Sequence, residues 1–318
     1  MIVSTPSRLH FGMFSFGRPE VRQYGGVGVM IDRPRIVVRF SPSEQLAVGE
    51  RMHERVQMFV DRATEFLGLD HPPACRIEVF EAPPEHVGLG VGTQLALAVA
   101  SGLARLVGRS DLDENQFAMA TGRAERSAIG TYGFCKGGLL IESGKQPDEV
   151  IAPLEKRVEM PAEWRFVLIR PTSGHGLSGS QEHQAFTDLP PVPEETTARL
   201  RTEALEHLAP AAAAADFDAF SESLYRYGYA AGMCFATAQG GPFAGTDLQQ
   251  LVETIRALGV RGVGQSSWGP TLFALARNDQ QAQQLSNQLQ PEASGSELSI
   301  TIAGPDNRGV RIDDEVAS

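Results

Sequence analysis

The sequence predicts an α+β protein made of two halves, and three observations support this. The chain has 318 residues, which is long for a single hydrophobic core. Segments typical of strands and of helices are mixed without strict alternation, which disfavours a doubly wound parallel sheet. A proline-punctuated stretch at residues 145–164, KQPDEVIAPLEKRVEMPAEW, marks the boundary between a first half at 1–160 and a second half at 161–318.

In the first half, RLHFGMFSF, RIVVRFS and CRIEVFEAPP predict strands because aromatic and β-branched residues predominate in them. RMHERVQMFVDRATEFLG has apolar residues at helical spacing and stops at Gly68, a typical C-terminal cap. DLDENQFAMATGRAER predicts a second helix that starts from Asp111 or Asp113. A glycine loop and an Ala/Leu-rich helix lie between these two, and GGLLIESG predicts a short strand.

The second half opens with a predicted strand, RFVLIRP, followed by the polar loop TSGHGLSGSQEHQAF. Helices are expected at 193–208, 216–238 and 248–258. The Gln-rich NDQQAQQLSNQL predicts the solvent-exposed face of a further helix. The chain then returns to strands around RGVGQSS, TLFALA, LSITIA and GVRID.

Composition excludes several classes of function. The net charge of −11 argues against nucleic acid or an anionic membrane as the main partner. The three cysteines are widely spaced and form no CxxC pair, so we expect reduced thiols and no zinc site. The N-terminus lacks a basic region followed by an apolar run, and no long uninterrupted apolar segment exists. We therefore expect a soluble, cytoplasmic protein.

The segment GLGVGTQ places glycines at alternate positions directly before a helix. Exposed N–H groups and the positive end of the helix dipole make such a loop suited to an anion. Thr93 and Gln94 add side-chain donors, and Thr93 can ligate a cation. The pattern matches neither GxxxxGK[ST] nor GxGxxG, and a structural turn that packs a helix closely on a sheet remains an equal alternative. The phosphate-binding candidates are Gly88, Gly90, Gly92, Thr93 and Gln94.

PSRLHFGMFSFG, HVGLGVGTQLALA and GQSSWGPTLFAL occur in the order and approximate spacing of the three motifs of GHMP kinases, which the sequence resembles. It resembles most the branch of β-ribofuranosylaminobenzene 5'-phosphate synthases, through SRLHFGM, GLGVGTQLALAVA, GRAERSAIGTYGFCKGG and GQSSWGPTLFAL, with GLSGSQEHQAF as further support. The resemblance implies the GHMP kinase-like two-domain fold, with an N-terminal half like domain 2 of ribosomal protein S5 and a ferredoxin-like C-terminal half.

A kinase of this superfamily commonly uses a carboxylate to orient or deprotonate the acceptor hydroxyl. The corresponding stretch here, GRAERSAIGTYGFCKGG, contains one acid, Glu125, and no Asp occurs between Gly122 and Gly144. It offers instead the cations Arg123, Arg126 and Lys136, which suit a multiply phosphorylated ligand. Ser127 follows them, and Glu125 with Thr93 is the expected ligand set for Mg²⁺.

The resemblance implies a decarboxylating phosphoribosyltransferase of tetrahydromethanopterin biosynthesis. Phosphoribosyl pyrophosphate would condense with 4-aminobenzoate, and carbon dioxide and pyrophosphate would leave. 4-Hydroxybenzoate stays open as the acceptor, because the two acids differ by one small polar group. The alternatives are an ATP-dependent small-molecule kinase and a non-catalytic sensor of phosphorylated ligands on the same fold. A homodimer is a family-level expectation.

The remaining candidates come from the motifs and from one polar loop. Arg8 and His10 share a face of a strand, where they could contact a phosphate or simply form an edge-strand pair. Gly25 and Gly26 form a turn beside the expected pocket, and His175 is an acid/base candidate in the polar loop. Gln265, Ser266 and Ser267 belong to the third motif; its Trp268 could stack on the aromatic acid or belong to the core.

Overall fold

The computed structural model describes residues 1–172, 189–267, 269–292 and 298–314. Two long strands, β1 (Ile2–Ser15) and β2 (Tyr24–Pro42), form the antiparallel centre of a seven-stranded sheet. The order β11-β1-β2-β4-β3 adds β3 (Ala47–Val48), β4 (Cys75–Glu81) and β11 (Arg311–Asp313). The first part of β2 pairs with β5 (Leu139–Glu142), which in turn pairs with β6 (Leu154–Val158).

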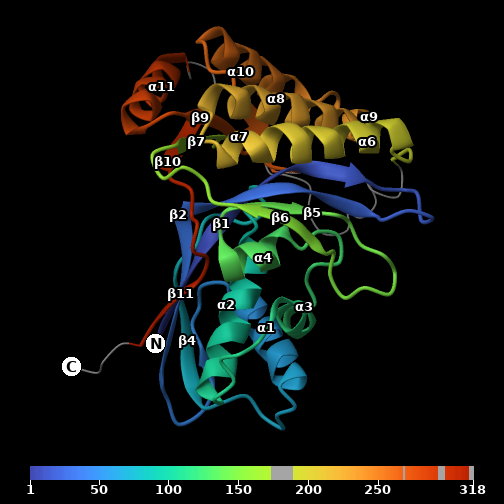
Figure 1. Cartoon of the computed structure of the whole chain (residues 1–318). Helices are drawn as coiled ribbons and strands as arrows, with labels where there is room; N and C mark the ends of the chain where they lie inside the picture. Colours follow the sequence, from blue (N-terminus) through green and yellow to red (C-terminus); the bar gives the residue numbers. More distant parts are fainter. Residues whose placement is uncertain (173–188, 268, 293–297, 315–318) are drawn as a thin grey trace.

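Four helices gather on one side of this sheet (Figure 1). They are α1 (His53–Phe66), α2 (Val91–Leu106), α3 (Glu114–Thr121) and α4 (Ile129–Lys136). The Ala/Leu-rich α2 is central, because it packs against the other three helices and against both long strands. Every residue from Leu95 to Ala104 is buried, as expected of a helix that is apolar all round.

The second half contains an antiparallel sheet of order β10-β7-β9-β8. Its strands are β7 (Arg165–Pro171), β8 (Val263–Gln265), β9 (Leu272–Ala276) and β10 (Leu298–Ala303). The helices of this half are α6 (Glu194–Thr202), a π-helical segment η1 (Glu203–Leu208), α7 (Ala209–Ala213), α8 (Phe217–Met233), α9 (Ala236–Gln239), α10 (Gly245–Ala257) and α11 (Asp279–Glu292). They group with the second sheet at the far end of the molecule from α1 and α3 (Figure 1).

One continuous core joins the two halves. The rings of Phe11 on β1 and Phe273 on β9 lie 5.1 Å apart, and α8 crosses β1 at Gly12. There the buried hydroxyl of Tyr227 donates to the Gly12 carbonyl at 2.8 Å. β1 therefore belongs to the first sheet and also contacts the second half. Its residues are held in place between the two halves.

The predicted α+β class is confirmed, and so are most of the predicted strands and helices. Asp113 caps α3 through a capping box with Gln116, but this helix ends at Thr121 rather than continuing to Arg126. The reason is Gly122, whose φ of +59° terminates the helix in the left-handed region. Residues 129–136, for which no element was expected, form α4, and β6 forms within the proline-punctuated stretch.

Across the residues that are described, no helix combines the length and the apolar character needed to cross a membrane.

Candidate functional site

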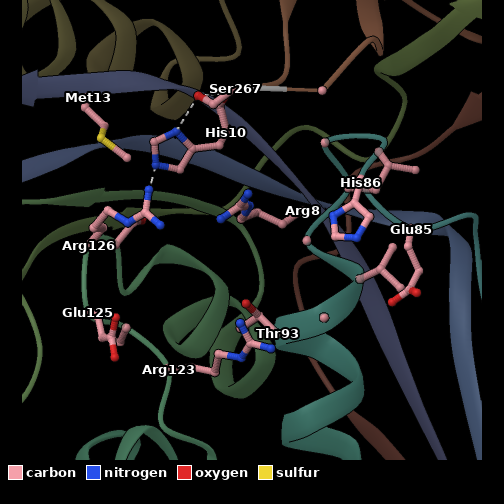
Figure 2. A pocket seen from close by; sticks show the side chains of 18 of the residues that line it. Arg8, His10, Met13, Glu85, His86, Thr93, Arg123, Glu125, Arg126 and Ser267 are labelled. Atoms are coloured by element: carbon pink, nitrogen blue, oxygen red, sulfur yellow. Dashed lines mark hydrogen bonds between the residues drawn. The ribbon is translucent and has the colours of Figure 1, made fainter. Parts of the chain in front are cut away.

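A cavity of about 410 Å³ opens where β1, the N-terminal end of α2 and the segment between α3 and α4 meet. Its volume falls in the usual range for small-molecule sites. Figure 2 shows the side chains that line it, with Arg8 near the centre, Arg126 beside His10, and Arg123 beside Thr93. The lining residues come from segments far apart in the sequence: Arg8, His10, Met13, Arg55, Glu85, His86, Gly88, Gly90, Gly92, Thr93, Arg123, Glu125, Arg126, Ser127 and Ser267 among them.

The glycine loop has the geometry that an anion requires. Gly88 and Gly90 have φ of +86° and +72°, a region that glycine enters at no steric cost. Gly90 precedes the first residue of α2, and its carbonyl accepts the N–H groups of Thr93 and Gln94. The first N–H groups of a helix have no partner within the helix, and they carry its positive dipole end. The loop therefore presents donors to the cavity.

Close packing is also a reason for these glycines. A Cβ on Gly88 would lie 2.9 Å from the carbonyl oxygen of Ser266, and one on Gly92 would lie 2.7 Å from a guanidinium nitrogen of Arg55. The structural alternative therefore holds for these glycines, and it is compatible with anion binding at the same loop. The loop is tight because arginine side chains and a second loop press against it.

Guanidinium groups dominate one side of the cavity. Arg55 and Arg123 both lie against the ring of Phe59, with their Cζ atoms 5.9 and 5.4 Å from its centroid. Burial lowers the pKa of Arg123, and the positive charges of Arg55 and Arg62 lower it further. Its buried Nε has no hydrogen-bond partner among the described residues. An anion bound here would relieve the repulsion between these cations.

Two carboxylates line the cavity beside four arginines. Glu85 forms an ion pair with Arg55, and Glu125 lies in the segment that carries Arg123 and Arg126. Among the described residues, no three His, Cys, Asp or Glu side chains come together as a metal site. Thr93 and Glu125 nevertheless place side-chain oxygen atoms on one cavity, which would suit Mg²⁺ that takes most of its ligands from phosphate and water.

His10 lies at the end of the cavity nearer the second half. Its Nδ1 is 3.0 Å from Ser267 Oγ, and its Nε2 is 3.2 Å from Ser127 Oγ (Figure 2 shows the Ser267 contact). Burial lowers the pKa of His10 well below its usual value, and the positive charge of Arg8 lowers it further. The imidazole is therefore neutral at pH 7, so it offers one N–H and one lone pair.

Most of the candidates from the sequence line this cavity. They are Arg8, His10, Gly88, Gly90, Gly92, Thr93, Arg123, Glu125, Arg126, Ser127 and Ser267.

Other candidates lie elsewhere, each for a visible reason. Lys136 is the last residue of α4, and its ammonium pairs with Glu114 at 2.8 Å. Gln94 is fully buried on α2, where its amide nitrogen donates to the Gly130 carbonyl. Neither side chain reaches the cavity.

The candidates from the third motif and from the turn at Gly25 and Gly26 are held by hydrogen bonds and close packing around the site. Ser266 donates its hydroxyl to the Gly88 carbonyl and accepts the N–H of His10, so it ties the glycine loop to β1. Gln265 bridges the Ala244 N–H and the Gly269 carbonyl. Gly25 and Gly26 are buried in the sheet, where a Cβ would meet Gly144 and Gly12. His175 and Trp268 lie outside the described residues.

The sequence did not reveal Arg55, Glu85 and His86 as lining residues, nor Glu142, which lies directly behind Ser127. Arg55 sits in an ordinary amphipathic helix, and Glu142 ends a short apolar strand. For Glu85 and His86 a signal existed, since both immediately precede the glycine loop.

Comparisons with known proteins identify the family of this chain. The family model for the GHMP kinases N-terminal domain matches residues 54–137, and the model for the C-terminal domain matches residues 208–294. A β-ribofuranosylphenol 5'-phosphate synthase of Archaeoglobus fulgidus is 29% identical over 97% of this chain and 98% of its own. One of Methanothermobacter thermautotrophicus is 26% identical over 86% and 88%.

Solved structures show the fold. A phosphomevalonate kinase of Streptococcus pneumoniae superposes with a TM-score of 0.69 at 12% identity, covering 96% of this chain and 99% of that one. A mevalonate pyrophosphate decarboxylase of Streptococcus pyogenes superposes with a TM-score of 0.65 at 13% identity, covering 96% of both chains. The same fold thus occurs in proteins named for kinase and for decarboxylase activities.

Proposed function

Because the chain belongs to the GHMP kinase superfamily and its curated relatives are named β-ribofuranosylphenol 5'-phosphate synthases, we propose that it is a decarboxylating phosphoribosyltransferase. The donor is phosphoribosyl pyrophosphate and the acceptor is a 4-substituted benzoate. One observation carries the proposal: the cavity surrounds the N-terminal end of α2 with four arginines, and its two carboxylates are an ion-paired Glu85 and Glu125.

Pyrophosphate is the group that needs these cations. When the bond between C1 of the ribose and the pyrophosphate oxygen breaks, the electron pair leaves with pyrophosphate and the ribose becomes oxocarbenium-like. Donors and cations aimed at the departing oxygens stabilise that charge without having to reorganise. Arg55, Arg123 and the first N–H groups of α2 would fill this role. Mg²⁺ held by Thr93 and Glu125 would neutralise further charge on the pyrophosphate.

The acceptor step requires no strong base. The ring carbon that bears the carboxylate attacks C1, and the electrons of its bond to carbon dioxide return to the ring. No proton has to be removed, so the neutral His10 and its two serine neighbours serve to orient the ribose and the acceptor. This agrees with a cavity surface that has no unpaired carboxylate other than Glu125 among the described lining residues.

The acceptor is 4-aminobenzoate or 4-hydroxybenzoate. The printed name of the curated relatives contains a phenol, which favours 4-hydroxybenzoate over the 4-aminobenzoate that the motif resemblance implied. Competition between the two acids at equal concentration would decide, with the mass of the product as the readout. The pathway, the homodimer and the cytoplasmic location stay predictions.

The test of the function is direct. Purified protein with phosphoribosyl pyrophosphate, either benzoate and Mg²⁺ should release carbon dioxide and pyrophosphate in equal amounts. ATP-dependent phosphorylation of a small alcohol, without this release, would instead support a kinase. Tight binding of phosphoribosyl pyrophosphate with no turnover would support a sensor.

A further inference from the structure

A buried carboxylate lies directly behind the wall of the cavity. Glu142, the last residue of β5, is fully buried. Its Oε2 accepts the N–H of Ala128 at 2.6 Å, and its carboxyl group interacts with the hydroxyl of Ser127. Its Oε1 has no hydrogen-bond partner among the described residues. Burying a carboxylate with half of its acceptors unused costs stability, so packing alone does not account for it.

Glu142 is connected to the cavity through a chain of four side chains. Ser127 interacts with Glu142 on one side and lies 3.2 Å from His10 Nε2 on the other. His10 Nδ1 lies 3.0 Å from Ser267 Oγ. Ser127, His10 and Ser267 line the cavity, whereas Glu142 is behind it. The chain links β5, the segment before α4, β1 and the third motif.

The hydrogen-bonding capacity of these four side chains decides which group donates and which accepts at each contact. A serine hydroxyl has one proton, and an ionised carboxylate can only accept. While Glu142 is ionised, Ser127 donates to it and can only accept at His10, which places the ring proton on Nε2. The Nδ1 lone pair then accepts from Ser267, whose alternative acceptor is the His10 carbonyl at 3.2 Å. When Glu142 is protonated, this constraint on Ser127 is lifted.

We propose that Glu142 is a positioning residue which, through Ser127, fixes the ring nitrogen of His10 that carries the proton. It thereby holds the hydroxyl groups of Ser127 and Ser267 in one arrangement toward the substrate. The role in turnover rests on the proposed function, whereas the proton order on His10 does not.

The environment of Glu142 places its titration in the neutral range. Burial raises its pKa to about 7, against the opposing effects of the Ser127 and Ala128 hydrogen bonds and the positive charge of Arg8 on β1. The phenols of Tyr132 on α4 and Tyr227 on α8 also interact with it, and the pKa of each is raised. Arg8 and Arg126 are the cations beside His10. The ordered state is thus expected above about pH 7 and is released below it.

The test is a pair of variants read by NMR without substrate. Glu142→Gln cannot ionise. Glu203→Gln is the matched control, because Glu203 also accepts from a serine, Ser223, at 2.5 Å, but outside the cavity. The ring ¹⁵N shifts of His10, identified by their loss in His10→Gln, report its tautomer. In the wild type and in Glu203→Gln they should change near pH 7, and in Glu142→Gln they should not.

Steady-state kinetics then test whether the protonated nitrogen of His10 affects turnover. Glu142→Gln should lower kcat about tenfold, the loss expected for one hydrogen bond to a charged group, and leave the KM for phosphoribosyl pyrophosphate nearly unchanged. The step in kcat near pH 7 should disappear, and Glu142→Asp should restore part of it. If Glu142→Gln does not fold, Ser127→Ala provides the second test. It keeps the Ala128 contact of Glu142 and removes the hydroxyl that links Glu142 to His10.

A change in the His10 shifts near pH 7 that persists in a folded Glu142→Gln or Ser127→Ala protein would overturn the proposal, as would a wild-type kcat profile in Glu142→Gln. A wild type that shows the His10 titration but releases no pyrophosphate would contradict the proposed function and leave the assignment of Glu142 intact.

Discussion

The two walls of the cavity differ in their charge and in how their polar groups are hydrogen-bonded. One, here called the arginine wall, consists of the glycine loop with Arg55 and Arg123 and presents cations to an open space. The other, the histidine wall, consists of His10, Ser127 and Ser267 backed by Glu142, and its polar groups are satisfied mainly by one another. The positive charge of the first suits an anion. The second orients neutral groups, which requires burial and defined hydrogen bonds. Changes to the first should therefore affect binding, and changes to the second should affect turnover and pH dependence.

The largest effect is expected at Arg123. Arg123→Ala removes a buried guanidinium from the proposed pyrophosphate site, and should reduce kcat/KM for phosphoribosyl pyrophosphate about 100-fold, as for loss of a charge-assisted bidentate contact. Steady-state kinetics with the donor varied measure this. Lys136→Ala is the comparison, because the sequence favours both cations whereas the structure pairs Lys136 with Glu114. An equal loss in the two variants would contradict the arginine wall.

A smaller effect is expected at Gly92. Gly92→Ala puts a methyl group 2.7 Å from the Arg55 guanidinium, which must move away from the loop. The KM for the donor should rise about tenfold, equivalent to losing one charged hydrogen bond. Gly92 is preferred to Gly90, because a side chain at the φ of +72° of Gly90 would strain the backbone. Gly228→Ala on α8 is the matched control, since a methyl group there meets open space. A wild-type KM for the donor in folded Gly92→Ala would show that Arg55 does not contribute to donor binding.

The histidine wall predicts opposing effects of pH on stability. Folding raises the pKa of Glu142 from 4.5 to about 7, so its contribution is lost as pH rises across this window, by up to about 1.4 kcal/mol per pH unit. Folding lowers the pKa of His10, so its contribution is lost as pH falls below 6.5. The two slopes oppose each other in the wild type.

Chemical denaturation at several pH values separates these slopes. The free energy of unfolding of Glu142→Gln should rise with pH up to about 6.5, because the effect of His10 is then unopposed. That of His10→Gln should fall as pH rises toward about 7. Parallel curves for the two variants would show that these groups are not buried as described.

The smallest effect is expected at Glu85. Glu85→Gln releases Arg55 from a partly exposed ion pair, so the KM for the donor should fall about twofold at low salt. Screening should remove the difference at high ionic strength. A rise in KM at both salt concentrations would instead mean that Glu85 holds Arg55 in its binding position.

The sequence by itself determined the α+β class, the glycine loop with its helix, and the candidates on β1 and before α4. These signals are local: glycines at alternate positions, a capping Asp113, and Arg8 and His10 two residues apart on a strand. Local backbone geometry and side-chain alternation can be read from neighbouring residues, so these predictions needed no tertiary information.

Only the tertiary structure decided which cations face the cavity and which acid stands behind it. Arg55 enters the site because α1 packs beside α2, and Lys136 leaves it because α4 turns its last residue toward Glu114. Glu142 ends an apolar strand, and its role depends on Ser127 and His10 lying beside it in space. Burial and hydrogen-bond partners are properties of the packed chain, so a polar residue in an ordinary strand carries no local sign of them.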